Sequence, residues 1–394
     1  MADVGYLFER FPSFGQTFCY REVAELERQG INVHVFSIRR PVDEPEQDWD
    51  QGIVGRVCYL PEEKPLVAEI DRVLKTGAVS DEVRAAVKDW GRQSDFLRLY
   101  QAVYVGLRMR QQGLHHVHAH FAGMAARTAY WIKRFFGIPF SFTAHANDIF
   151  APRDFAVSLA KLFESASAVV TVSDFSVRQL QERFPDSAAK IHRVYNGVDV
   201  SRFSPADFKG TVPVVCSIGR LIEKKGFGDL IAACSLLRDD GRAFECRIIG
   251  EGPLEQELRA QIAAAGLEKL VQLTGPRTQA QIAPELAGST AFVLPCRRER
   301  DGGMDNLPTV IMEAMAAGLP VISTPLAGVP EMVENETSGE LVPEQDPAAL
   351  AAAIARLMDD PQRARQLGEQ GRQIARQKFA IDESARQLRE LFKL

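Results

Sequence analysis

The chain of 394 residues is about twice as long as a typical single domain, so its length favours two domains with a core each. Hydrophobic residues make up 46% and charged residues 25% of it, which is average for soluble globular proteins and excludes extended disorder, collagen-like repeats and coiled coils. There are 47 Lys and Arg residues against 52 Asp and Glu residues, and the net charge of −5 excludes a protein built to coat nucleic acid.

The cysteines and the amino-terminal residues indicate a cytoplasmic protein. None of the six cysteines forms a Cys-x-x-Cys pair or lies at zinc-finger spacing from a histidine, so we expect free thiols in a reducing compartment. The first residues show no basic segment followed by a long apolar one, and no run of ~18 apolar residues occurs. We therefore expect neither a signal peptide nor a membrane span.

Short apolar runs alternate with helical stretches along the chain. The runs lie at 33–37, 117–120, 140–144, 169–172, 214–218, 246–249, 292–294 and 321–323. Because they are continuously apolar, they are typical of parallel strands covered by helices on both faces, and the sequence predicts a doubly wound α/β architecture.

A polar stretch that contains Pro and Gly, at 196–213, indicates a domain boundary. We expect one domain at 1–205 and a second at 206–375. The chain ends in a helical tail, and we expect its last part, 376–394, to cross back and join the first domain. An end cap on the second domain is the other interpretation, and the sequence does not decide between them.

The loop after the predicted strand 214–218 has the composition of a diphosphate site. Ligands of open α/β sheets bind at the carboxyl ends of the strands. Arg220 can make a planar fork to phosphate oxygens, Lys225 adds a point charge, and Gly226 lets the backbone approach the anion. A solvated charged loop is the other interpretation.

The segment 305–320 predicts a helix whose amino terminus faces a ligand. Pro308 suits the first turn of the helix and Gly318 suits its end. The free backbone N–H groups at such a terminus attract anions, and Glu313 can accept hydrogen bonds from two ribose hydroxyls. A Glu in an apolar helix is costly without partners, so a pairing with an Arg at the edge of the core is the alternative.

Histidines mark the ends of two predicted strands. His116, His118 and His120 share one strand face and could bind zinc, but no carboxylate or cysteine with ligand spacing accompanies them. We expect instead that His120, at the carboxyl end of its strand, faces a cleft between the domains and donates to a phosphate or sugar oxygen. His145 follows the next strand and has the same predicted role, with a satisfied core histidine as the alternative.

Several motifs together resemble the donor half of glycosyltransferase family 4. They are 219–226, 250–253, 305–313, 318–322 and 328–331, with 196–199 resembling the signature between the domains. The amino-terminal segment 10–18, with Arg10, Phe11, Pro12, Thr17 and Phe18, is similar to the colanic-acid type of exopolysaccharide transferases. The resemblance implies a GT-B fold, in which two Rossmann-like lobes face each other across a cleft, with retaining chemistry, a nucleotide-sugar donor and no metal or other cofactor.

The resemblance also implies roles for individual residues. The catalytic candidates are His120, His145 and Asp305, and no metal ligand is expected. The donor-binding candidates are Gly219, Arg220, Lys225, Asn306, Leu307 and Glu313, with Glu313 on the ribose and Arg220 and Lys225 on the diphosphate. Asp305 and the amides of Asn306 and Leu307 are to hold the transferred sugar. The acceptor-side candidates are Gly15, Gln16, Thr17 and Asp148. Asp305 stands where the family usually has Glu, and its side chain is one methylene shorter.

The function implied is transfer of a sugar from a UDP- or GDP-linked donor to a glycan or a polyprenyl-diphosphate-linked acceptor in polysaccharide biosynthesis. Because no further carboxylate is evident as a nucleophile in the first domain, we favour attack on the same face, with the leaving diphosphate accepting the proton. A nucleotide-sugar epimerase and a non-catalytic binding partner are the alternatives.

The segment 84–136 is rich in basic and aromatic residues. It could rest on an anionic membrane surface that holds a lipid-linked acceptor, which would place the protein at the inner face of the cytoplasmic membrane. The alternative is that the aromatic residues belong to the core and the charges are merely solvated.

Overall fold

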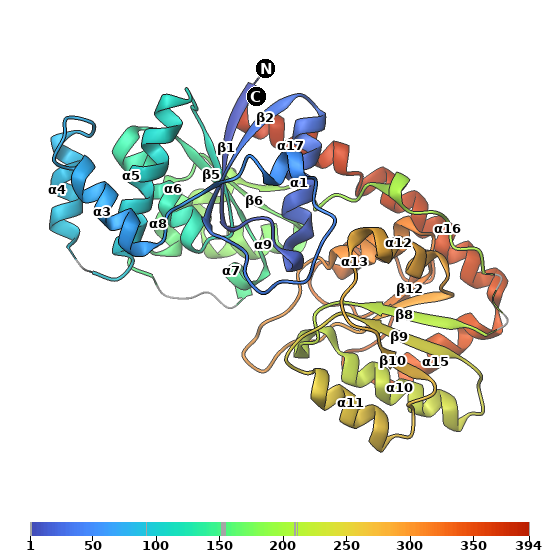
Figure 1. Ribbon diagram of the computed structural model, residues 1–394. Helices are drawn as coiled ribbons and strands as arrows, with labels where there is room; N and C mark the ends of the chain where they lie inside the picture. The colour runs from blue at the N-terminus through green and yellow to red at the C-terminus, as the bar shows by residue number, and fades with distance from the viewer. Residues whose placement is uncertain (1, 92, 151–154, 209, 211, 394) are drawn as a thin grey trace.

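The protein is built on two parallel β-sheets, as its computed structural model shows for residues 2–91, 93–150, 155–208, 210 and 212–393 (Figure 1). The seven strands of the first sheet are arranged β3-β2-β1-β4-β5-β6-β7, and the six of the second β10-β9-β8-β11-β12-β13. In each sheet the chain starts at a central strand, adds strands toward one edge and then adds the remaining strands toward the other edge. This reversal of the strand order falls between β1 and β4 in the first sheet and between β8 and β11 in the second, as in a Rossmann fold. The predicted α/β class is confirmed.

The first lobe comprises the first sheet with helices α1 to α9 and α17. Its strands are β1 (Ala2–Arg10), β2 (Ile31–Arg39), β3 (Cys58–Tyr59), β4 (Val117–His120), β5 (Phe140–Ala144), β6 (Ala168–Thr171) and β7 (Ile191–Arg193). Its helices are α1 (Thr17–Arg28), α2 (Gln51–Val54), α3 (Glu63–Val73), α4 (Asp81–Trp90), α5 (Phe96–Gln111), α6 (Met124–Phe136), α7 (Ala146–Phe150), α8 (Leu159–Ser165), α9 (Asp174–Arg183) and α17 (Ile381–Phe392).

The second lobe comprises the second sheet with helices α10 to α16. Its strands are β8 (Val214–Ile218), β9 (Glu245–Ile249), β10 (Val271–Leu273), β11 (Ala291–Leu294), β12 (Val321–Ser323) and β13 (Gly339–Leu341). Its helices are α10 (Phe227–Asp239), α11 (Glu255–Ala264), α12 (Gln279–Ala287), α13 (Thr309–Ala316), α14 (Val329–Met332), α15 (Pro347–Asp359) and α16 (Pro361–Lys378). Every run predicted as a strand overlaps a strand of one of the two sheets.

The central strand β1 separates two hydrophobic cores in the first lobe. Val4, Tyr6 and Phe8 are buried on the face covered by α1 and α17, whereas Leu7 packs on the opposite face among residues of α5 and α6. This alternation follows from the two-residue period of a strand. The sequence analysis did not predict this strand, because Asp3, Gly5, Glu9 and Arg10 interrupt its run of apolar residues.

The chain passes between the lobes twice, and the two passages are hydrogen-bonded to each other. The N–H of Val198 donates to the carbonyl of Phe379 at 2.8 Å, and the N–H of Ile381 donates to the carbonyl of Val198 at 3.2 Å. A Cβ on Gly197 would lie 2.3 Å from Cα of Ile381, so only glycine fits there. The predicted domain boundary at residue 205 lies beyond the first passage and stays a prediction.

The carboxyl-terminal helices divide between the lobes. Leu367 and Ala375 of α16 are buried in the core of the second lobe, whereas Leu388 and Phe392 of α17 are buried with β1 and α1 in the first. The ring of Phe392 lies 4.7 Å from that of His118 and 6.4 Å from that of Tyr6, between ring centres. The last helix therefore completes the core of the first lobe.

The basic and aromatic segment 84–136 is partly buried, so only some of its side chains could contact a membrane. Arg98, Arg127 and Trp131 are buried, and the edge of the Trp90 ring packs on Trp131, so these aromatic rings belong to the core. The exposed basic side chains of the segment are Lys88, Arg110, Lys133 and Arg134, and Arg92 lies outside the described residues. Within the part of the chain that the structure describes, no helix has the length and apolar character needed to cross a bilayer.

The position of α17 predicts that Phe392→Ala lowers the free energy of unfolding by about 3–5 kcal/mol, because a buried aromatic side chain leaves a cavity. Chemical denaturation followed by circular dichroism measures this change. Leu236→Ala is the matched control, since Leu236 is 44% exposed and its loss should change stability by less than about 0.5 kcal/mol. Equal effects of the two substitutions would contradict the packing of α17 in the first lobe.

Candidate active site

A cavity of about 1180 Å³, here called the cleft, lies between the two lobes and is lined by residues of both. The first lobe contributes the segment after β1, the start of α1 and His145 after β5. The second lobe contributes the loops after β8 and β9 and the segment leading into α13. These are carboxyl ends of strands on both sides of the points where the strand order reverses, which is where open α/β sheets bind ligands.

Most of the predicted site residues line the cleft. They are Gly15, Gln16, Thr17, His145, Gly219, Arg220, Lys225, Asp305, Asn306, Leu307 and Glu313. Two predicted residues, His120 and Asp148, are not among the described residues that line it. The topology thus brings together candidates from opposite halves of the sequence, while their roles stay predictions.

Glycines let the loops after β8 and β9 pack against each other. A Cβ on Gly250 would lie 1.9 Å from the carbonyl oxygen of Gly219, and one on Gly252 would lie 2.7 Å from that of Leu221. Both glycines have positive φ angles, of 145° and 155°, which side chains disfavour. The close packing of these loops leaves Arg220 lining the cleft.

Lys225 and Asp305, predicted for the diphosphate and the sugar respectively, form an ion pair with each other. The Lys225 Nζ lies 2.5 Å from one carboxylate oxygen of Asp305, and the Lys224 Nζ lies 3.5 Å from the other. Burial raises the pKa of Asp305, but the two lysines lower it more, so the carboxyl is ionised. Asp305 is therefore the anion that balances two cations in this wall of the cleft.

Glu313 pairs with an arginine from across the cleft. Its carboxylate accepts a hydrogen bond from the Arg21 guanidinium of α1, which also donates to the Thr17 hydroxyl at 2.9 Å. Both side chains of the pair are 9% exposed. The alternative of a Glu–Arg pair is thus realised, but the arginine belongs to the other lobe. The Nε of Arg21 is buried and has no hydrogen-bond partner among the described residues.

The helix that carries Glu313 begins and ends where its sequence predicts. Pro308 caps α13 at its amino terminus, one residue before the first helical position, and Gly318 follows its end with a φ of 71°. The backbone N–H groups of Asn306 and Leu307 donate to no group in the described residues. They are free donors at the wall of the cleft.

The prediction that His120 faces the cleft is wrong. Its side chain is fully buried, because α1 covers the end of β4 and places Cys19 and Glu22 against the imidazole ring. Its Nδ1 lies 3.2 Å from Nε2 of His145, which does line the cleft. His120 therefore contacts a cleft residue and not the cleft itself.

Asp148 does not line the cleft, whereas the amino-terminal candidates Gly15, Gln16 and Thr17 do. The Asp148 carboxylate accepts a hydrogen bond from the backbone N–H of His145 at 2.9 Å, so it holds the turn after β5, and burial raises its pKa to about 6. Gly15, Gln16 and Thr17 lie at the start of α1 in the wall of the cleft. A Cβ on Gly15 would lie 3.9 Å from the Arg220 side chain, so the two lobes approach closely here.

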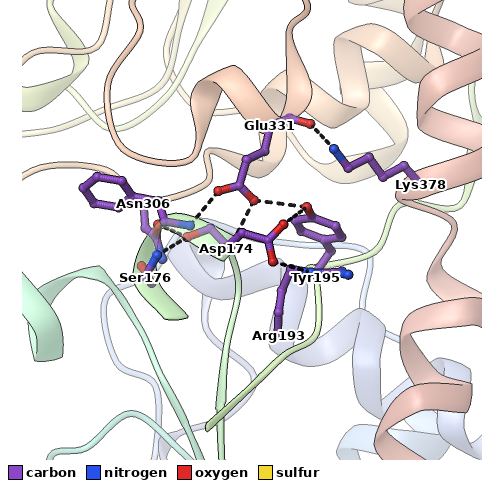
Figure 2. A network of polar contacts seen from close by, with 9 residues as sticks. Asp174, Ser176, Arg193, Tyr195, Asn306, Glu331 and Lys378 are labelled. Atoms are coloured by element: carbon purple, nitrogen blue, oxygen red, sulfur yellow. Dashed lines mark hydrogen bonds and ion pairs between the residues drawn. The ribbon is translucent and has the colours of Figure 1, made fainter. Parts of the chain in front are cut away.

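A second set of contacts joins the lobes beside the cleft (Figure 2). Glu331 of α14 accepts hydrogen bonds from the backbone N–H groups of Asp174 and Phe175, at 2.9 and 2.8 Å, and from the Tyr195 hydroxyl at 3.0 Å. A carboxylate of the second lobe thus caps the first turn of α9 in the first lobe.

Asn306 connects this contact to the wall of the cleft that the second lobe forms. Its side-chain oxygen accepts a hydrogen bond from the Ser173 hydroxyl at 2.6 Å, and its backbone carbonyl accepts one from the N–H of Gly328 at 2.9 Å. A Cβ on Gly328 would lie 2.8 Å from that carbonyl, so this approach requires glycine. The segment that presents the free N–H groups is therefore held from both lobes.

Sequence reasoning missed Arg21, Glu22 and Glu331 as residues of the site. Arg21 follows Thr17 by one helical turn, which is a weak signal because many surface arginines have this spacing. Glu331 belongs to a motif that was recognised, but its partner is a helix terminus 157 residues away along the chain. Such contacts follow only from the arrangement of the two lobes.

Comparisons with known proteins agree with this geometry. The model of Glycosyltransferase Family 4 matches residues 15–202, and the model of Glycosyl transferases group 1 matches residues 202–374. The two models together span both lobes. Residues 15–202 are thus similar to glycosyltransferase family 4, and residues 202–374 are similar to the glycosyl transferases of group 1.

Curated relatives narrow the likeness to exopolysaccharide enzymes. The chain is 39% identical over 198 residues to the putative colanic acid biosynthesis glycosyltransferase WcaL of Escherichia coli, an alignment that covers 50% of this chain and 48% of the relative. It is 46% identical over 143 residues to the amylovoran biosynthesis glycosyltransferase AmsK of Erwinia amylovora, which covers 36% and 35%. The chain thus spans about half or less of the length of these relatives.

Solved structures share the whole fold. The glycosyltransferase of Rickettsia africae aligns with a TM-score of 0.75 at 18% identity, covering 100% of this chain and 99% of that one. HepE of Anabaena in complex with UDP and glucose aligns with a TM-score of 0.75 at 18% identity, covering 100% of both. At these identities the likeness establishes the GT-B fold.

The cap on α9 predicts that Glu331→Ala lowers the free energy of unfolding by about 1–2 kcal/mol, since the helix terminus loses its acceptor. Thermal and chemical denaturation measure the change. Glu334→Ala is the matched control, because Glu334 is exposed three residues further along the same segment. A loss no greater than that of the control would show that Glu331 does not hold the two lobes together.

Proposed function

We propose that the protein is a retaining, metal-independent glycosyltransferase that moves a sugar from a nucleotide-sugar to a glycan or lipid-linked acceptor in the assembly of an exopolysaccharide or cell-surface polysaccharide. The observation that carries this proposal is the donor wall of the cleft, where Arg220 and Lys225 lie beside the free N–H groups of Asn306 and Leu307. Cations and unpaired N–H groups together suit a diphosphate joined to a sugar.

Binding of the donor requires an exchange of partners in this wall. Glu313 is to hold the ribose hydroxyls, which it can do only when Arg21 releases its carboxylate. We expect Lys225 to bind the diphosphate while it stays paired with Asp305. The diphosphate then adds an anion to the group formed by Lys224, Lys225 and Asp305. The local charge of +1 before binding favours the incoming diphosphate.

We propose that the donor is a hexose linked to UDP or GDP. HepE of Anabaena was solved with UDP and glucose, and a relative in Mycolicibacterium smegmatis that is 31% identical over 230 residues is named as a GDP-mannose-dependent mannosyltransferase. A thermal-shift panel of UDP, GDP, ADP and dTDP selects among the bases, since a ligand that binds the native state raises its stability.

The arrangement of carboxylates supports attack on the same face of the sugar. Asp305 is engaged by two lysines, and Glu313 is to be engaged by the ribose hydroxyls once Arg21 has released it, so neither is free to act as a nucleophile. We therefore assign the proton of the acceptor hydroxyl to the leaving diphosphate, which Arg220 and Lys225 stabilise as its charge develops. His145 then donates to a sugar or phosphate oxygen from the opposite wall.

The acceptor is expected to lie along the first lobe, against Gly15, Gln16 and Thr17. A lipid-linked acceptor would be presented by a membrane, and the exposed side chains of Lys88, Arg110, Lys133 and Arg134 supply a basic surface for an anionic leaflet. Sedimentation with vesicles of phosphatidylglycerol, compared with vesicles of phosphatidylcholine, tests this peripheral contact.

Transfer itself is tested by proton NMR of the donor with protein alone and then with the acceptor. A transferase gives a new glycosidic anomeric signal only when acceptor is present, and the configuration of that signal reports whether the linkage is retained. A change in the donor's sugar without acceptor would instead identify an epimerase, and no change in either case would identify a binding protein.

The donor wall predicts that Glu313→Gln and Lys225→Ala each weaken binding of the nucleoside diphosphate about ten- to 150-fold, the value of a hydrogen bond to a charged group. Calorimetry with the nucleotide chosen by the thermal-shift panel measures the affinity. Lys269→Ala is the control, since Lys269 is exposed and is not among the residues that line the cleft. Unchanged affinity in both variants would remove the cleft as the donor site.

We further expect turnover without a divalent metal, because Arg220 and Lys225 already supply two positive charges at the leaving group. Initial rates are compared in excess EDTA and in added Mg²⁺ or Mn²⁺. A rate that EDTA abolishes and the metal restores would contradict this expectation, while equal rates would support it.

A further inference from the structure

A row of side chains, buried except for the partly buried Glu22, leads from the core of the first lobe to the cleft. The Tyr6 hydroxyl donates to Oε1 of Glu22 at 2.8 Å, and the same oxygen lies 3.1 Å from Nε2 of His120. The other ring nitrogen of His120, Nδ1, lies 3.2 Å from Nε2 of His145. Only the last member, His145, lines the cleft.

The protonation of the two histidines follows from their surroundings. Burial lowers the pKa of His120, but Cys19 and Glu22 outweigh it and raise that pKa to about 10. Burial also raises the pKa of the Cys19 thiol, so at pH 7 Glu22 supplies the negative charge beside the His120 imidazolium. Burial and the charge of His120 hold the pKa of His145 well below its usual range, so His145 is neutral.

These states determine which nitrogen of His145 carries the proton. A His120 imidazolium has a hydrogen on both nitrogens, so it donates to Glu22 through Nε2. Its Nδ1 lies 3.2 Å from Nε2 of His145 and 3.4 Å from Sγ of Cys19, and it donates to His145 because an imidazole nitrogen is a stronger acceptor than a thiol sulfur. The Nε2 of His145 is then an acceptor, and its ring hydrogen lies on Nδ1. That atom bonds to no described residue, while the ring lines the cleft, so its N–H is available to a ligand.

We propose that the Glu22–His120 ion pair is a positioning device that holds His145 in its Nδ1–H tautomer and so presents a hydrogen-bond donor to the oxygen of the donor sugar or diphosphate. Neither Glu22 nor His120 touches the substrate. This inference rests on the proposed function, and it gives the buried pair a purpose in that reaction. Tyr6 holds the Glu22 carboxylate against His120.

The same cluster contains atoms that could ligate a metal, from Glu22, His118 and His120 within 4.8 Å of one another. His118, however, is already satisfied, because its two nitrogens lie 2.8 and 3.0 Å from the hydroxyls of Ser141 and Thr143. Both ring nitrogens of His118 and of His120 and the Oε1 of Glu22 already have hydrogen-bond partners, and a metal would have to displace them.

The test reads the tautomer directly, on the protein alone. Long-range ¹H–¹⁵N spectra of protein labelled on its seven histidines distinguish the two neutral tautomers from the imidazolium, and His145→Gln identifies the His145 signals. We expect an Nδ1–H His145 and a doubly protonated His120 at pH 7. In Glu22→Gln we expect His120 to become neutral and His145 to populate both tautomers.

The kinetic part of the test separates positioning from binding. Glu22→Gln and His120→Gln should lower kcat on the order of a hundredfold, the cost of misplacing a catalytic group, while donor affinity stays within about twofold. Glu27→Gln is the control, since Glu27 lies on the same helix and pairs with exposed Arg56. It should change neither the tautomer nor kcat.

The proposal would be overturned by an Nε2–H tautomer of His145 in the unsubstituted protein, by a tautomer unaffected by Glu22→Gln, or by stoichiometric zinc on the purified protein. An unchanged kcat in folded Glu22→Gln would also overturn it. Absence of any transfer by the unsubstituted protein would refute the proposed function instead, and the spectra distinguish this case because they need no substrate.

Discussion

A carboxylate of the second lobe binds the end of a helix in the first, and this contact helps to fix how the two lobes face each other. The carboxylate of Glu331, in the second lobe, accepts hydrogen bonds from the N–H groups of Asp174 and Phe175 at the start of α9 in the first lobe. Asn306 accepts a hydrogen bond from Ser173, one residue before that helix. Because a helix terminus has a definite direction, these bonds orient the lobes as well as joining them. The free N–H groups of Asn306 and Leu307 belong to the segment that is bonded to Ser173, so the shape of the cleft depends on this contact.

Both carboxylates considered above, Asp305 and Glu313, are paired with cations, and the two pairings differ in what they connect. Lys225 and Asp305 lie within the second lobe, so their pairing survives any movement between the lobes. Arg21 and Glu313 belong to different lobes, and their pairing requires the lobes to be close. A ligand that takes Glu313 thus competes with a contact between the lobes, and the partly buried Arg21 then needs an anion of its own.

The sequence predicts the frame of the site better than its detail. Strands such as β4, β5 and β8 and the limits of α13 follow from local patterns of apolar residues, proline and glycine, and motif residues at strand ends reach the cleft as a parallel sheet requires. The burial of His120 was not predictable, because it depends on α1 lying over β4. The pairing of Arg21 with Glu313 spans 292 residues and has no local signal. The short strand β3 lies at the edge of its sheet, and its position follows from pairing with β2.

The second passage of the chain between the lobes has a consequence for synthesis. Tyr6 of the first strand and Phe392 of the last helix pack in one core, with the whole second lobe between them in the sequence. On the ribosome the first lobe therefore exposes the face of β1 and β4 until α17 has been made, although domains usually fold in the order of their synthesis. The lobe whose synthesis begins first is therefore completed last.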